Sequence, residues 1–140
     1  MGDLRKNFSS EEFACRCGCG LKFNIDEALL DLLQFTRDEL GEPLTILSGC
    51  RCRAHNSSTI GAADNSWHIP RDNLMGPPVL YAADVSYADK SKRTAENILR
   101  LYAYLSQGKA KGLGLYSNRC HADTRPTKRV ARWISAMPRS

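Results

Sequence analysis

Two amphipathic segments, separated by a long stretch rich in glycine and proline, restrict the folds open to this sequence. Leucines recur at helical spacing over residues 24–40, and a second apolar stripe follows over 91–106, made of Ala95, Ile98, Leu99, Tyr102 and Leu105. Asn24 and Glu27 are placed to form a capping box at the first helix, and Gly41 marks its end. Residues 49–80 contain repeated breakers and are predicted to be loop.

Short strands are predicted on both sides of the second helix. Residues 44–47 follow the first helix directly, and residues 81–87 alternate small or polar with apolar side chains. Further strand candidates lie at 112–116, 119–123 and 129–134. Helices and strands in this order predict the α+β class.

The length and composition predict a single globular domain over residues 1–140. Hydrophobic residues make up 42% of the chain and charged residues 25%, which is the ordinary range. No apolar run approaches the roughly 20 residues of a membrane span. The N-terminus lacks the apolar core and cleavage site of a secretory signal, so we expect synthesis in the cytoplasm without a signal peptide.

The net charge of +5 comes from the C-terminal end, residues 125–140, which is basic and contains no acid. Such a surface attracts polyanions such as nucleic acid or an anionic wall polymer, although a solvated end that aids solubility is the simpler interpretation. No helix-turn-helix, ribonucleoprotein or basic-zipper signature is present, so a nucleic-acid partner is not predicted.

Three residues have the types and number expected of a catalytic metal site. His68 lies in the predicted loop, Asp84 lies within a predicted strand among small and apolar residues, and His121 lies in the sequence Cys-His-Ala-Asp. Two imidazoles and one carboxylate make the open zinc site of hydrolases, in which water takes the fourth position. Taken alone, the residues also fit buried core histidines and an aspartate paired with an arginine.

Several short motifs occur in the order seen in one family. They are Ser-Gly-Cys-Arg at 48–51, His-Asn at 55–56, Ser-x-His at 66–68, Ala-Ala-Asp-Val at 82–85, Gly-Leu-Gly-Leu-Tyr at 112–116 and His-Ala-Asp-Thr-Arg at 121–125. The chain therefore resembles the zinc D-Ala-D-Ala carboxypeptidase family, which also contains phage endolysin L-alanyl-D-glutamate peptidases. The resemblance covers roughly residues 8–134. It implies a hedgehog-like fold with a small antiparallel sheet and two main helices.

The resemblance also implies roles for individual residues. It makes His68, Asp84 and His121 the zinc ligands, and Ser66 a hydrogen-bonding residue for substrate or ligand. Arg51 corresponds to the family's substrate arginine, which binds substrate and stabilises the developing oxyanion, work that suits a permanently charged fork of donors.

The spacing of the first two ligands departs from the family. Residues 69–78 look like an insertion, and Asp72 within them is a rival to Asp84 as the ligand. Asp84 is preferred because a strand positions a ligand better than a loop rich in proline and glycine.

The general base is the second departure. Many relatives have an acid shortly before the last histidine, where this chain has Asn118. Asp123 shares a strand face with His121, so it is either the base or, as we favour, a carboxylate that orients an imidazole. His55 is the other candidate base, or a residue that caps the loop.

Six cysteines occur, at positions 15, 17, 19, 50, 52 and 120. Cys-x-Cys spacing is tighter than that of most structural zinc sites, so the sequence supports a second zinc only weakly. Reduced thiols are expected in the absence of a signal sequence, with Cys50 and Cys120 packed in the core. One zinc per chain is therefore predicted.

Together these features predict a monomeric zinc metallopeptidase that hydrolyses peptidoglycan stem peptides, as an endopeptidase or as a D-Ala-D-Ala carboxypeptidase. It would act at the cell wall when released or delivered, as a phage endolysin is. The alternative is a non-catalytic, zinc-containing binding or phage structural module of the same fold, which Asn118 favours.

Overall fold

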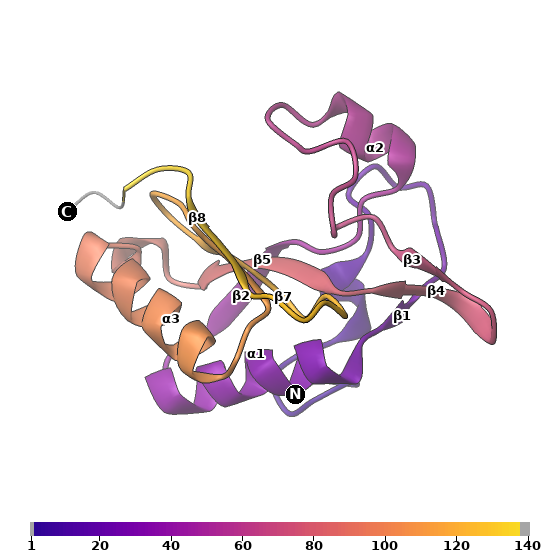
Figure 1. The fold of residues 1–140 in the computed structure, drawn as a ribbon. Coiled ribbons are helices and arrows are strands. Elements are labelled where there is room, and N and C mark those ends of the chain that lie inside the picture. Colours follow the sequence, from indigo (N-terminus) through magenta and orange to yellow (C-terminus); the bar gives the residue numbers. More distant parts are fainter. Residues whose placement is uncertain (1, 138–140) are drawn as a thin grey trace.

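A computed structural model describes residues 2–137 of the chain (Figure 1). Arg139 of the basic C-terminal end lies outside the described residues. The α-helices are α1 (Glu27–Leu40), α2 (Arg53–Ser58) and α3 (Ala95–Gln107), and short 3-10 helices lie at Ser10–Phe13 and Lys90–Lys92. The strands are β1 (Asn24–Ile25), β2 (Leu44–Ser48), β3 (Arg71–Asn73), β4 (Gly76–Leu80), β5 (Ala82–Tyr87), β6 (Gly112–Leu115), β7 (Cys120–Asp123) and β8 (Ala131–Ile134).

The main sheet has the strand order β2-β5-β7-β6-β8. Its pairs are antiparallel except for β6 with β8, which are parallel. In the central pair, Asp84 of β5 lies directly opposite His121 of β7. Residues opposite each other in a sheet point to the same face, so this register alone brings two of the expected ligands together. The α+β class predicted from the sequence is confirmed.

Helices α1 and α3 pack against each other on one face of this sheet, away from α2 (Figure 1). Leucines of α1 and residues Ile98, Leu101 and Leu105 of α3 are buried in the core. The thiol of Cys120 lies 3.8 Å from the carbonyl oxygen of Ile98, so Cys120 faces α3. Because neighbours on a strand point to opposite faces, His121 points away from the helices.

The first helix begins later than the sequence suggests. Asn24 does not cap it, because Asn24 and Ile25 pair in parallel with β4, and the helix begins at Glu27 after Asp26. The backbone pairing with β4 takes precedence over the local capping box. At the other end, Gly41 closes the helix in the left-handed conformation, with φ of 66°, as predicted.

The region predicted as loop contains regular structure. Residues 49–80 include α2 and the hairpin β3–β4, which forms a small second sheet of order β1-β4-β3. The partner of β4 is β1, which is far away in the sequence, so no local sequence pattern predicts the pairing. The buried stripe of α3 also differs, since Leu101 is buried while Leu99 is 44% exposed.

None of the helices formed by residues 2–137 has the length and apolar character that crossing a bilayer requires.

Candidate active site

Three side-chain atoms of His68, Asp84 and His121 converge on one point. The Nε2 of His68 lies 3.2 Å from Oδ1 of Asp84 and 3.2 Å from Nδ1 of His121. The third side, from Nδ1 of His121 to Oδ1 of Asp84, measures 3.3 Å. Ligands around a tetrahedral zinc ion, at about 2.0–2.1 Å from the metal, stand roughly 3.3 Å apart. The triangle therefore has the size of three ligands around one small cation.

Backbone contacts fix the orientation of the His68 ring. Its Nδ1 lies 2.7 Å from the carbonyl oxygen of Gly49 and must donate, because a carbonyl can only accept. The N–H of Arg51 donates to the carbonyl of His68 at 2.8 Å, and the N–H of His68 donates to the hydroxyl of Ser66 at 3.1 Å. The Nε2 lone pair is thereby turned toward Asp84 and His121, as a metal ligand requires.

A buried carboxylate orients the ring of His121. The Nε2 of His121 donates to Oδ2 of Asp123 at 2.7 Å, which leaves Nδ1 free to coordinate. Both oxygens of Asp123 also accept from Arg125, at 2.8 Å from Nε and 2.6 Å from Nη2. Asp123 thus lies behind the imidazole with its acceptor positions in use, an arrangement suited to orienting a ligand.

The glycines of β6 leave room for these contacts. Gly112 is opposite Asp123 in the sheet, and a Cβ at this position would overlap the Asp123 carboxylate. Gly114 leaves space in the same way for the ring of Trp133, which lies 5.0 Å from the ring of His121. The Gly-Leu-Gly pattern is therefore explained by the side chains that surround His121.

The electrostatics favour the protonation states that metal binding needs at His68 and Asp84, whereas at His121 they favour the protonated ring. Burial lowers the pKa of His68 and so favours its neutral ring. Burial would raise the pKa of Asp84, but the two imidazoles lower it well below its usual range. Burial would also raise the pKa of Asp123, but hydrogen bonds from Arg125 and His121 lower it to about 2. At His121, burial favours the neutral ring, whereas hydrogen bonds to Asp123 and Asp84 raise its pKa.

We expect Asp123→Asn to weaken zinc binding by about 10–100-fold, because an amide supports the basicity of the His121 imidazole less well than a carboxylate. Competition with a chromogenic chelator measures the affinity. The exposed Asp72 supplies the matched control, and Asp72→Asn should bind zinc as the wild type does. Equal affinities for the wild type and Asp123→Asn would remove this role from Asp123.

The two aspartates considered as ligands lie in different surroundings. Asp84 is 6% exposed and belongs to the group of three that can hold a metal ion, whereas Asp72 is exposed on β3. The outer oxygen of Asp84, Oδ2, faces two guanidinium groups. Nη2 of Arg51 lies 3.6 Å away and Nε of Arg119 lies 3.8 Å away.

The three residues lie in a cleft of about 590 Å³, within the usual size range of ligand sites. Arg51 and Ser66 also line it, as the sequence suggested. Among the described residues that line the cleft, Asp84 is the only acid. The cations and aromatic residues in its wall are Arg51, Arg119, Arg125, Trp67, Tyr116 and Trp133. A cleft with this lining is suited to an extended ligand that carries carboxylates.

Asn118, which stands where many relatives have an acid, and the candidate base His55 both lie outside the cleft. Asn118 is exposed, and its carbonyl accepts a hydrogen bond from Ser86 at 2.5 Å. The Nδ1 of His55 lies 3.3 Å from the sulfur of Cys15, and His55 does not line the cleft.

Sequence reasoning passed over three residues of the cleft. Arg119 stands two positions before His121, and Arg125 two positions after Asp123, so strand alternation offered a signal for both. Trp133 had no local signal, because the parallel pairing of β8 with β6 places it opposite Gly114.

In a comparison with known families, residues 6–123 match the family model described as Peptidase M15. The matched range contains His68, Asp84 and His121. Comparison with curated proteins found no match.

Proposed function

The chain belongs to the Peptidase M15 family, and on this basis we propose that it is a zinc-dependent peptidase that hydrolyses the stem peptides of peptidoglycan. The observation that carries the proposal is the triangle of ligand atoms, 3.2–3.3 Å on each side, at the floor of a cationic cleft. Family membership supports a peptidase, while the metal and the substrate are our inference.

The residues of the triangle would hold the zinc ion through Nε2 of His68, Oδ1 of Asp84 and Nδ1 of His121. Zinc, when bound there, supplies a Lewis acid that polarises the peptide carbonyl and lowers the pKa of a bound water toward about 7. Asp123 and Arg125 keep the His121 ring in the orientation and tautomer that coordination needs. Arg51 places a guanidinium beside the site, where it can bind substrate and stabilise negative charge on the oxygen of the attacked carbonyl.

The charge of the cleft supports the substrate class. Stem peptides carry free carboxylates, and the described lining of the cleft holds one acid and three arginines, Arg51, Arg119 and Arg125. A guanidinium binds a carboxylate through two parallel hydrogen bonds, so Arg51 and Arg119 are suited to such a group, whereas the guanidinium of Arg125 is already paired with Asp123. The basic C-terminal end would add attraction to anionic wall polymer. We propose that the protein acts as a monomer at the wall, after release or delivery, and favour cleavage within the stem over removal of a terminal D-Ala.

Mass spectrometry of muropeptides after digestion of purified peptidoglycan tests this function. We expect new peptide termini that a chelator prevents and that added zinc restores, and the termini identify the bond. Because the described part of the cleft lining offers no acid besides Asp84 in place of the family's usual base, we expect slow hydrolysis. Absence of chelator-sensitive products at every pH between about 5 and 9 would end the catalytic proposal.

One observation favours a second candidate, the non-catalytic binding module. Asn118 occupies the position where many relatives have an acid, and among residues 2–137 the only acid that lines the cleft is Asp84 itself. A binding module would retain peptidoglycan fragments in a pull-down without changing their mass. The same digestion experiment therefore separates the two candidates.

A further inference from the structure

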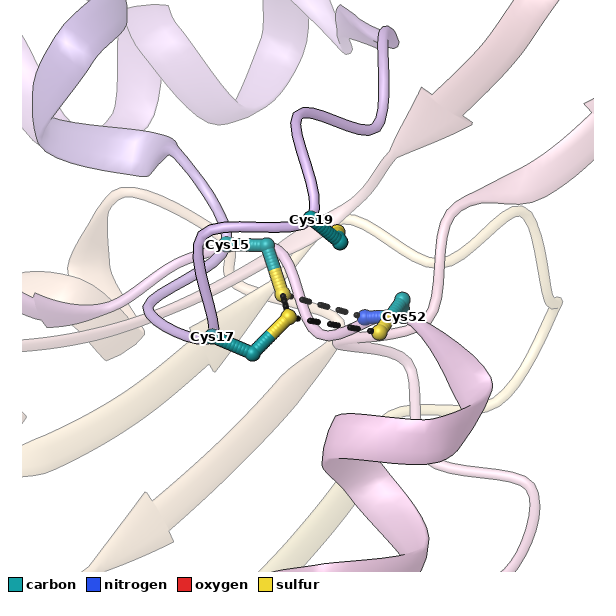
Figure 2. Close-up of side chains that lie close together, drawn as sticks. All are labelled: Cys15, Cys17, Cys19 and Cys52. Atoms are coloured by element: carbon teal, nitrogen blue, oxygen red, sulfur yellow. Dashed lines mark hydrogen bonds between the residues drawn. The ribbon is translucent and has the colours of Figure 1, made fainter.

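A second group of potential metal ligands lies outside the cleft (Figure 2). The sulfur atoms of Cys15, Cys17, Cys19 and Cys52 all lie within 4.8 Å of one another. The Cys15–Cys17 sulfur distance is 3.3 Å and the Cys17–Cys52 distance is 3.6 Å. Four thiolates around a tetrahedral zinc ion, at about 2.3 Å from the metal, stand roughly 3.8 Å apart. The cluster therefore has the number of ligands and the approximate size of a closed metal site.

Packing accounts for Cys15, which is buried in the core, but not for Cys17 and Cys19. Cys50 and Cys120 are fully buried in the core, as expected of cysteines that serve as small apolar residues. Cys17 and Cys19, in contrast, are exposed, so their side chains gain little from the core. Their common feature is that their sulfurs face Cys15 and Cys52 across a short gap (Figure 2).

Backbone N–H groups point at three of the four sulfurs. The N–H of Cys52 donates to Cys15 at 3.4 Å, that of His55 donates to Cys52 at 3.4 Å, and that of Leu21 donates to Cys19 at 3.5 Å. Hydrogen bonds from backbone N–H groups stabilise the negative charge of a thiolate, the form that binds metal. They also orient the sulfurs, as the groups around metal ligands commonly do.

We propose that Cys15, Cys17, Cys19 and Cys52 bind a second zinc ion with a structural role. Four protein ligands leave no open position for water or substrate, which is the arrangement of a structural rather than a catalytic site. The tight Cys-x-Cys spacing argued against this site in the sequence. The fold adds a fourth ligand from a distant part of the sequence, because Cys52, at the start of α2, lies beside the segment 15–19.

The position of the cluster indicates which segments a bound metal would connect. Cys52 directly follows Arg51, whose N–H donates to His68, and Gly49 accepts from the His68 ring. On the other side, the N–H of Cys50 donates to the carbonyl of Phe13 at 2.8 Å. A metal bound to the four cysteines would fasten the N-terminal segment to residues 49–52, and thereby hold both Arg51 and the ring of His68 in place.

Metal content and cobalt spectroscopy test the second site. Reduced wild-type protein should hold two equivalents of zinc by elemental analysis. After replacement by cobalt, it should show the intense sulfur-to-cobalt charge-transfer absorption that thiolate ligands produce. The double variant Cys17→Ser/Cys19→Ser should lose one zinc equivalent and this absorption. The matched control Cys120→Ala changes a cysteine outside the cluster, and it should keep two zinc equivalents and the absorption.

His68→Ala separates this proposal from the proposed function, because it should lose the equivalent of the cleft but keep the charge-transfer absorption. Zinc should also raise the Tm of metal-free His68→Ala, since an ion that binds only the folded state stabilises it. This measurement needs no cysteine variant, so misfolding of a cysteine variant does not affect it. One zinc equivalent in the reduced wild type without the absorption, or no Tm rise in His68→Ala, would overturn the second site whatever the peptidase assay shows.

Discussion

Replacement of His68 or His121 with alanine is expected to empty the metal site of the cleft and reduce peptidoglycan hydrolysis to background. Each histidine supplies one of three ligand atoms spaced 3.2–3.3 Å apart, and both rings are almost fully buried. Loss of a catalytic metal removes several kcal/mol of transition-state stabilisation, so the rate should fall by at least about 10³-fold. Elemental analysis and a hydrolysis assay on the same preparation measure both effects.

The same experiment can compare the two aspartates considered as ligands, Asp84 and Asp72. Asp84→Ala should lose metal and activity as the histidine variants do, whereas Asp72→Ala, on the exposed strand β3, should keep both. The opposite result, with metal retained by Asp84→Ala and lost from Asp72→Ala, would transfer the ligand role to Asp72. Circular dichroism of each variant shows whether the fold survives.

Arg51→Ala is expected to reduce turnover by about 10²–10³-fold, the usual effect of removing one donor that stabilises an oxyanion. The guanidinium of Arg51 lies 3.6 Å from Oδ2 of Asp84 and also contacts Ser48 and Asn56, which hold it at the edge of the site. Zinc content and Tm should stay nearly unchanged. Arg51→Lys should recover little activity, because an ammonium lacks the planar fork of donors.

The neighbouring Arg53 is the control for Arg51. It is exposed at the start of α2, and Arg53→Ala should leave turnover unchanged. If Arg51→Ala loses zinc or unfolds, Arg51 serves as a structural partner of Asp84 and has no demonstrated role in turnover.

The parts of the site that could be predicted from the sequence are those set by local strand geometry. Asp84 and His121 each lie in a short strand with recognisable alternation, and the two strands are neighbours in the sheet. Asp123 follows from the same alternation, since it shares a face with His121. The resemblance to a family then supplied His68, whose loop position carries no geometric information of its own.

The parts that could not be predicted depend on pairings between distant segments. The strand β1 replaces the expected start of the first helix because β4 pairs with it, and Trp133 reaches His121 only through the parallel pairing of β8 with β6. The cysteine cluster depends in the same way on the approach of α2 to the N-terminal segment. Long-range contacts of this kind leave little trace in local propensity or spacing.

The most direct test of the account is to return zinc to metal-free protein and measure the rate of peptide-bond hydrolysis in purified peptidoglycan. We predict that the rate of the wild type rises with added zinc and saturates once the site of His68, Asp84 and His121 is filled, while His68→Ala stays at background throughout. A rate that is independent of zinc, or a zinc-dependent rate in His68→Ala equal to that of the wild type, would contradict the account.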